Sequence, residues 1–93
     1  MKKIVECVPN FSEGRDHQII EAIAAEITAV EGVKLLGVDP DKDYNRTVVT
    51  FVGEPQAVVQ AAFAATQKAA QLIVFIYSLI FHPFLNRNFL FFV

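Results

Sequence analysis

The sequence predicts an α/β (α+β) sandwich, in which two helices cover one face of a single, mostly antiparallel sheet. Two observations support this prediction. Runs of strand-forming residues alternate with two segments whose apolar residues recur at helical spacing, and the resulting order is β-α-β-β-α. That order is the first five elements of a split β-α-β unit, a ferredoxin-like half that a fourth strand would close.

The first strand is predicted over residues 4–8, followed by a loop over 9–14 that is rich in turn-forming residues. A helix over 17–31 comes next, with Asp16 as its N-cap and Gly32 as a left-handed C-terminal cap. Its apolar stripe consists of Ile19, Ile20, Ile23, Ile27 and Val30.

Strands over 33–38 and 46–52 are predicted to form a hairpin, because only a short, charged turn over 39–43 separates them. A second helix follows over 54–72, with Pro55 in its first turn. Its many alanines allow close packing on a sheet. Its buried side is predicted to consist of Val58, Val59, Ala62, Phe63, Thr66 and Ala70.

The composition divides the chain near Ile73. Residues 1–68 carry 17 of the 18 charged residues, whereas six of the nine phenylalanines lie in the last 19 positions. Residues 1–73 are therefore predicted to be the folded domain, and 74–93 an aberrant hydrophobic tail. The tail is rich in amino acids with AT-rich codons, which is typical of translation out of frame. We expect it to lower solubility, and a chain ending at Gln71 to be more soluble.

Charge and cysteine content exclude several classes of protein. The net charge of −2 and the lack of a lysine or arginine cluster argue against nucleic-acid binding. One cysteine excludes an intrachain disulfide and a cysteine-based zinc site, and we expect no metal. The N-terminus meets a glutamate before any apolar run, unlike a signal peptide, so a cytoplasmic protein is expected.

The segment from Val5 to Gly14, VECVPNFSEG, leads from a strand into a polar loop beside a helix start. Loops at the end of a sheet often bind ligands in α/β proteins, and Asn10, Ser12 and Glu13 offer polar groups for this. The alternative interpretation is an Asx-type turn with a capping glutamate.

This segment, together with VD at 38–39, NRTV at 45–48 and TFVG at 50–53, resembles the N-terminal subdomain of glutamate formiminotransferase. The resemblance runs from about residue 4 to Ile73. It implies an enzyme that transfers a formimino group from N-formimino-L-glutamate to tetrahydrofolate, the one-carbon acceptor, in histidine degradation. It also implies a cleft between two α/β subdomains, a cytoplasmic location and a homodimer.

The resemblance also suggests site residues. The family carries its catalytic histidine in a Gly-Glu-His-Pro-Arg-Met-Gly motif, and His82 is followed by proline here but lacks the other flanking residues. An imidazole suits the role of base, because its unperturbed pKa lies near 6.5. Asp39 can orient the base or hold an amidinium, and Arg46 can pair with a carboxylate. Asn10 and Asn45 can hydrogen-bond a ligand. Alternatively, Asp39 only forms a turn and Arg46 a surface ion pair.

Three functional hypotheses follow. The first is a fragment of a glutamate formimidoyltransferase that binds a small-molecule substrate but is itself inactive, because the motif around His82 and a second subdomain are missing. The second is a non-catalytic folate-binding or protein-interaction module. The third is a small membrane-associated protein that uses its Phe-rich tail, although the apolar run from Leu72 to Phe81 is too short to span a bilayer alone.

Overall fold

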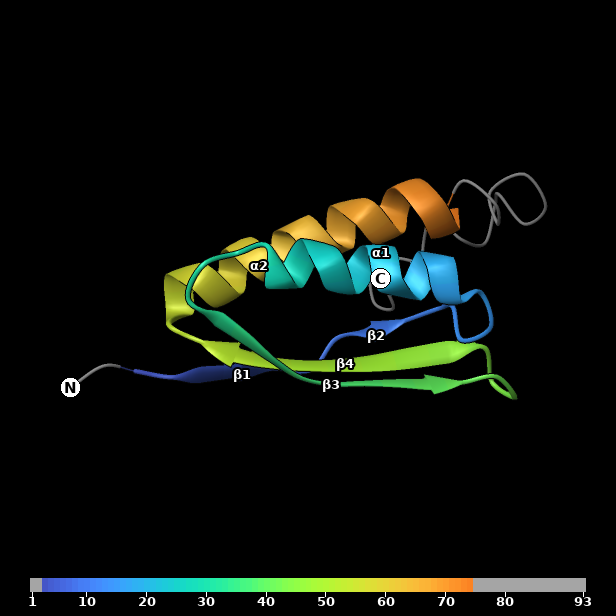
Figure 1. Cartoon of the computed structure of the whole chain (residues 1–93), viewed down its shortest axis with the longest axis horizontal. Helices are drawn as coiled ribbons and strands as arrows, with labels where there is room; N and C mark the ends of the chain where they lie inside the picture. The colour runs from blue at the N-terminus through green and yellow to red at the C-terminus, as the bar shows by residue number, and fades with distance from the viewer. Residues whose placement is uncertain (1–2, 75–93) are drawn as a thin grey trace.

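The computed structural model describes residues 3–74, which form a four-stranded antiparallel sheet with two helices packed on one face (Figure 1). The predicted α+β sandwich is thereby confirmed. In chain order the elements are β1 (Val5–Cys7), β2 (Asn10–Phe11), α1 (His17–Thr28), β3 (Val33–Asp41), β4 (Arg46–Gly53) and α2 (Pro55–Ala69), which continues as a π-helical turn over Ala70–Val74.

β4 is the central strand of the sheet. β3 pairs with it along its whole length on one side, as the predicted hairpin requires. On the other side β1 pairs with its second half and β2 with its first half. The interruption lies at Pro9, which has no N–H to donate but whose carbonyl accepts from the amide of Val49 at 3.1 Å. The predicted loop over 9–14 was therefore wrong at Asn10 and Phe11, which belong to the sheet.

Side chains alternate between the two faces of β4, as expected for a strand. Thr47, Val49 and Phe51 are buried beneath the helices. The other set lies on the face that no described helix covers, called the open face below, and consists of Arg46, Val48, Thr50 and Val52.

β3 is longer than predicted. Asp39, Pro40 and Asp41 pair with Val48, Thr47 and Arg46, so the predicted turn over 39–43 was wrong and the turn lies at 42–45. Proline is tolerated here because β3 is an edge strand among the described residues.

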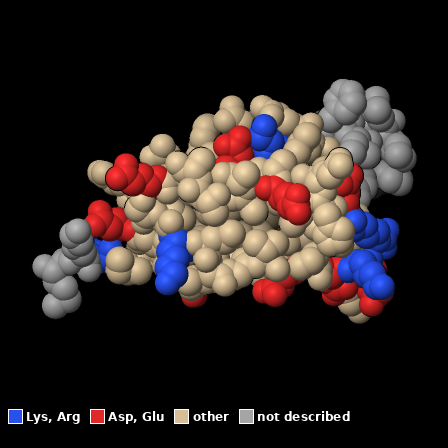
Figure 2. Space-filling model, in the orientation of Figure 1, with Lys and Arg blue, Asp and Glu red and all other residues tan. Residues whose placement is uncertain are grey.

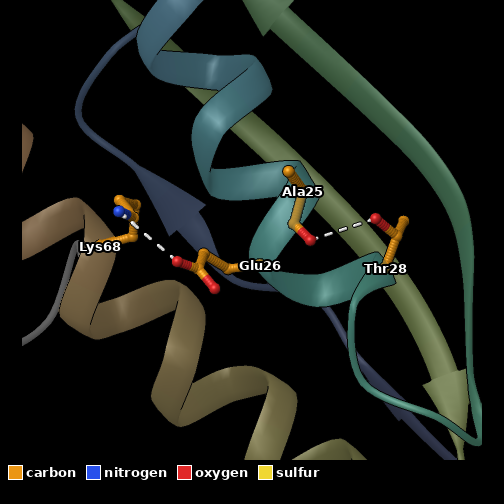
Figure 3. A network of polar contacts seen from close by, with 4 residues as sticks. All are labelled: Ala25, Glu26, Thr28 and Lys68. Carbon is orange, nitrogen blue, oxygen red and sulfur yellow. Dashed lines mark hydrogen bonds and ion pairs between the residues drawn. The ribbon is translucent and has the colours of Figure 1, made fainter.

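α1 forms over the predicted stripe. All five apolar residues of that stripe are buried, and the carboxylate of Asp16 caps the helix by accepting from the amides of Gln18 and Ile19. The predicted end was wrong. The helix stops at Thr28, whose hydroxyl donates to the carbonyl of Ala25 at 3.2 Å (Figure 3), and Gly32, with φ of 92°, lies in the following turn.

The buried side of α2 differs from the prediction. Val59 and Phe63 are 69% and 70% exposed, and the buried residues are Val58, Ala61, Ala65 and Ala69. Alanines at the contact allow α2 to approach α1 and the sheet closely, which larger side chains would prevent. Between the helices, Lys68 and Glu26 form an ion pair at 3.5 Å (Figure 3), and its partial exposure makes it worth little.

The described core ends at Ile73, whose side chain is fully buried. Within residues 3–74 no helix is both long and apolar enough to cross a membrane. His82 and nearly all of the predicted hydrophobic tail lie outside the described residues.

Candidate functional site

One transverse row of the open face brings together two of the predicted site residues. Val48 of β4 pairs with Asn10 of β2 on one side and with Asp39 of β3 on the other. Register partners in antiparallel strands point to the same face, so both polar side chains flank Val48. Adjacent strands lie about 4.8 Å apart, which puts the Asn10 and Asp39 backbones roughly 10 Å from each other.

Arg46 lies on the same face, one step toward the end of β4. It is two residues from Val48, a distance of roughly 7 Å along a strand, and its register partner is Asp41. Both residues are exposed. The guanidinium of Arg46 therefore lies within reach of the row formed by Asn10, Val48 and Asp39. The neighbouring carboxylate of Asp41 partly offsets its positive charge.

The loop between β2 and α1 is fixed to the β3–β4 hairpin by three successive residues. The carbonyl of Glu13 accepts from the hydroxyl of Thr47, the amide of Gly14 donates to Oδ1 of Asn45 at 2.9 Å, and Nε of Arg15 donates to the carbonyl of Lys42 at 2.7 Å.

Gly14 is buried against the hairpin. A Cβ at this position would collide with the carbonyl oxygen of Asp41 and would lie 2.5 Å from that of Arg46. The glycine is thus required by a close backbone approach.

Glu13 folds the loop from within. One oxygen of its carboxylate accepts from the amides of Arg15 and Asp16, each at 3.0 Å. These contacts lie within the loop, before the first turn of α1, whose cap is Asp16. That carboxylate oxygen is therefore engaged in the structure of the loop.

An open depression of about 600 Å³ lies beside this contact between the loop and the hairpin. Asp39 and Val48 form its border with the row on the open face, and His17 reaches it from the first turn of α1. Its lining consists of Gly14, His17, Asp39, Pro40, Asp41, Lys42 and Val48. Donors, acceptors and an imidazole thus surround a space that a small polar molecule can enter.

Charged side chains of both signs gather at the end of the molecule where the hairpin turns and α1 begins (Figure 2). The exposed charged residues at this end are Arg15, Asp16, Asp41, Lys42, Asp43 and Arg46. A mixed field of this kind suits a zwitterionic or bifunctional ligand better than a polyanion.

Cys7 lies away from this end, half-buried against the core. Burial raises the pKa of its thiol, because the thiolate loses hydration.

Within residues 3–74, no group of three or more histidine, cysteine or acidic side chains is arranged to hold a metal ion.

The structure brings together three of the five predicted site residues, Asn10, Asp39 and Arg46, at one end of the open face. Asn45 instead binds the β2–α1 loop, and His82 lies outside the described residues. Sequence reasoning missed His17 and Lys42 as lining residues, because only the folding of the loop onto the hairpin brings them to the depression.

A scan against protein-family models matches residues 4–85 to the formiminotransferase domain, N-terminal subdomain. The chain belongs to this formiminotransferase family. The match spans most of the 93 residues and includes every site residue predicted above.

Relatives of this formiminotransferase subdomain come from distant organisms. It is 58% identical to formimidoyltransferase-cyclodeaminase of Dictyostelium discoideum and 51% to that of Rattus norvegicus, in each case over 73 residues, which are 78% of this chain and 14% of the relative. It is 49% identical to glutamate formimidoyltransferase of Thermoplasma acidophilum over 70 residues, 75% of this chain and 23% of that protein. The chain thus spans a quarter or less of the length of these relatives.

Proposed function

We propose that this chain supplies one wall of a formiminotransferase site, where a formimino group passes from N-formimino-L-glutamate to N5 of tetrahydrofolate. The observation that carries the proposal is the row formed by Asn10, Val48 and Asp39, which borders the depression in a chain of this family. Tetrahydrofolate is the one-carbon acceptor, and the glutamate part of either ligand offers carboxylates for Arg46.

The roles of the residues follow from the chemistry. Attack of N5 on the formimino carbon forms a tetrahedral intermediate, and the bond from that carbon to the glutamate nitrogen then breaks as this nitrogen takes a proton. A base must take the N5 proton, and we assign that role to His82 by resemblance. The carboxylate of Asp39 would hold the cationic amidinium of the donor or orient the base. Asn10, on the opposite side of Val48, has both a donor and an acceptor for the ligand.

The wider setting belongs to the same proposal. We place the reaction in the cytoplasm, in the breakdown of histidine, with a homodimer as the assembled enzyme. A second α/β subdomain would face the open side of the sheet and close the cleft.

The isolated chain is proposed to be inactive. Catalysis requires a base positioned to within about 1 Å and a site that orders both substrates, and one wall of a cleft does not supply this. Formation of 5-formiminotetrahydrofolate by the 93-residue chain, abolished in a His82→Ala variant, would contradict this part of the proposal.

A chimera tests whether the wall itself is functional. The 73-residue segment of the Dictyostelium relative that matches this chain is replaced by the corresponding residues of this chain. We expect the chimera to transfer the formimino group at a rate within about 100-fold of the unmodified relative, because a misplacement of site groups by about 1 Å can cost that much. A chimera that folds, binds neither substrate and has no activity would refute the proposed function.

A further inference from the structure

Asn45 adopts a backbone conformation that few side chains tolerate. Its φ is 54°, the left-handed region, and it is the last residue of the turn that joins β3 to β4. Asparagine is among the residues that enter this region most readily. The conformation directs Oδ1 of Asn45 at the amide of Gly14, 31 residues earlier in the chain.

The surroundings of that hydrogen bond show that the two backbones meet with no room to spare. Gly14 is buried, and a Cβ there would collide with the backbone of the strands on both sides of the turn. The neighbouring bonds, from Thr47 to Glu13 and from Arg15 to Lys42, engage the residues on either side of Gly14. The bond from Gly14 to Asn45 is therefore at the centre of the contact.

This contact joins the two segments that border the depression. The loop that follows Asn10 leads to Gly14 and His17, and the hairpin carries Asp39 and Lys42. If the loop moved away from the hairpin, Gly14 and Asp41 would separate and the depression would widen.

We propose that Asn45 is a positioning residue: by holding the Gly14 amide, it keeps the β2–α1 loop on the hairpin and fixes the shape of the depression. This reassigns a residue that the sequence predicted to contact ligand. The effect on ligand binding rests on the proposed function, whereas the effect on the loop does not.

Three substitutions separate the acceptor from the backbone conformation. Asn45→Gly retains the left-handed φ but removes the acceptor, and Asn45→Asp retains both. Asn45→Ala removes the acceptor and disfavours the φ as well. If Asn45 instead donated its side-chain amide to a ligand, Asn45→Asp would lose that donor and would resemble Asn45→Gly.

Hydrogen exchange followed by mass spectrometry on the full chain, at low concentration, measures the loop directly. We expect amides of residues 12–18 to exchange about tenfold faster in Asn45→Gly than in the unmodified chain, and at the unmodified rate in Asn45→Asp. Amides of β4 residues 47–53 serve as the internal control and should change little. Unchanged exchange over 12–18 in Asn45→Gly, or an equal acceleration in β4, would overturn the proposal.

The same exchange measurement with tetrahydrofolate tests the ligand arm. Slower exchange over 12–18 on addition of tetrahydrofolate to the unmodified chain and Asn45→Asp, but not to Asn45→Gly, supports the positioning role. Loss of this response in Asn45→Asp, with the loop still protected, would show direct ligand contact and overturn it. If tetrahydrofolate has no effect on any chain, the ligand arm fails with the proposed folate site, and the exchange without ligand still decides whether Asn45 holds the loop.

Discussion

Asn10 and Asp39 occupy the same row of the open face, one on each side of Val48. They lie 29 positions apart in the sequence, and each is placed by pairing with the central strand β4. Because both strands are in register with the same residue, a shift of either by one position would move its polar side chain to the buried face. The candidate site thus depends on the register of the sheet.

The close approach of Gly14 to the hairpin predicts that Gly14→Ala is strongly destabilising. The added methyl group would meet the backbone of Asp41 and Arg46, which cannot rotate away as a flexible side chain can. We expect a loss of about 1–3 kcal/mol or more in the free energy of unfolding, measured by urea denaturation. Gly37→Ala is the matched control, because its methyl group would meet only Oδ2 of Asp39, at 3.6 Å. Equal losses in both variants would contradict this account.

Two phenylalanines differ in burial, and this difference predicts unequal losses of stability when each is replaced by alanine. Phe51 is fully buried beneath the helices, whereas Phe63 is 70% exposed on α2. Phe51→Ala should lower the free energy of unfolding by about 3–5 kcal/mol, and Phe63→Ala should change it by about 0.5 kcal/mol or less. Thermal and urea unfolding check both values. A large loss in Phe63→Ala would mean that the sequence-predicted stripe of α2 was right after all.

The sequence could predict which elements form because their patterns are local. The predicted stripe of α1 was confirmed, because large isoleucines mark its buried side. The prediction for α2 was largely wrong, because its buried side consists mainly of alanines, which are hard to distinguish from exposed residues by hydrophobicity. Pro9 and Pro40 were predicted to be loop residues. In the structure Pro40 pairs with Thr47 of β4, and Pro9 directly precedes β2 and accepts from the amide of Val49. Asn10 was predicted from the polar loop after the first strand and Asp39 from the resemblance, but the depression depends on a contact between distant segments that no local pattern contains.

The burial of Ile73 predicts where the chain can be shortened. A chain ending at Gln71 loses this core side chain, so we expect it to be less stable than one ending at Val74 by about 2–5 kcal/mol, as for a large-to-small core change. The chain ending at Val74 should also be more soluble than the full chain, because it lacks six phenylalanines of the last 19 positions. Sedimentation and urea unfolding of the three chains check this. Equal solubility with and without residues 75–93 would argue against an out-of-frame tail.

The raised pKa of the Cys7 thiol predicts a pH dependence of stability. The thiol ionises more readily in the unfolded chain than in the folded one. The contribution of this thiol to the free energy of unfolding is therefore fully present below the unfolded pKa, roughly 8.5. It is lost as the pH rises through the folded pKa. The free energy of unfolding should therefore fall more steeply above about pH 9 in the native chain than in Cys7→Ala. Alkylation by iodoacetamide should also be slower in the folded chain than in urea. Equal alkylation rates would show that the thiol is not shielded.

The charge of Asp39 is predicted to matter for transfer, and a second aspartate nearby provides the control. Asp39 borders the depression in the row with Asn10, whereas Asp43 is exposed in the hairpin turn and does not line the depression. In the chimera with the Dictyostelium relative, Asp39→Asn removes the negative charge but preserves the shape of the side chain. We expect kcat/KM to fall about 100-fold or more, because the carboxylate would stabilise the amidinium or the protonated base. Asp43→Asn should stay within about twofold, since an exposed charge in a turn is largely screened. Similar losses in both variants would show that the overall charge of the hairpin, and not the position of Asp39, accounts for the effect.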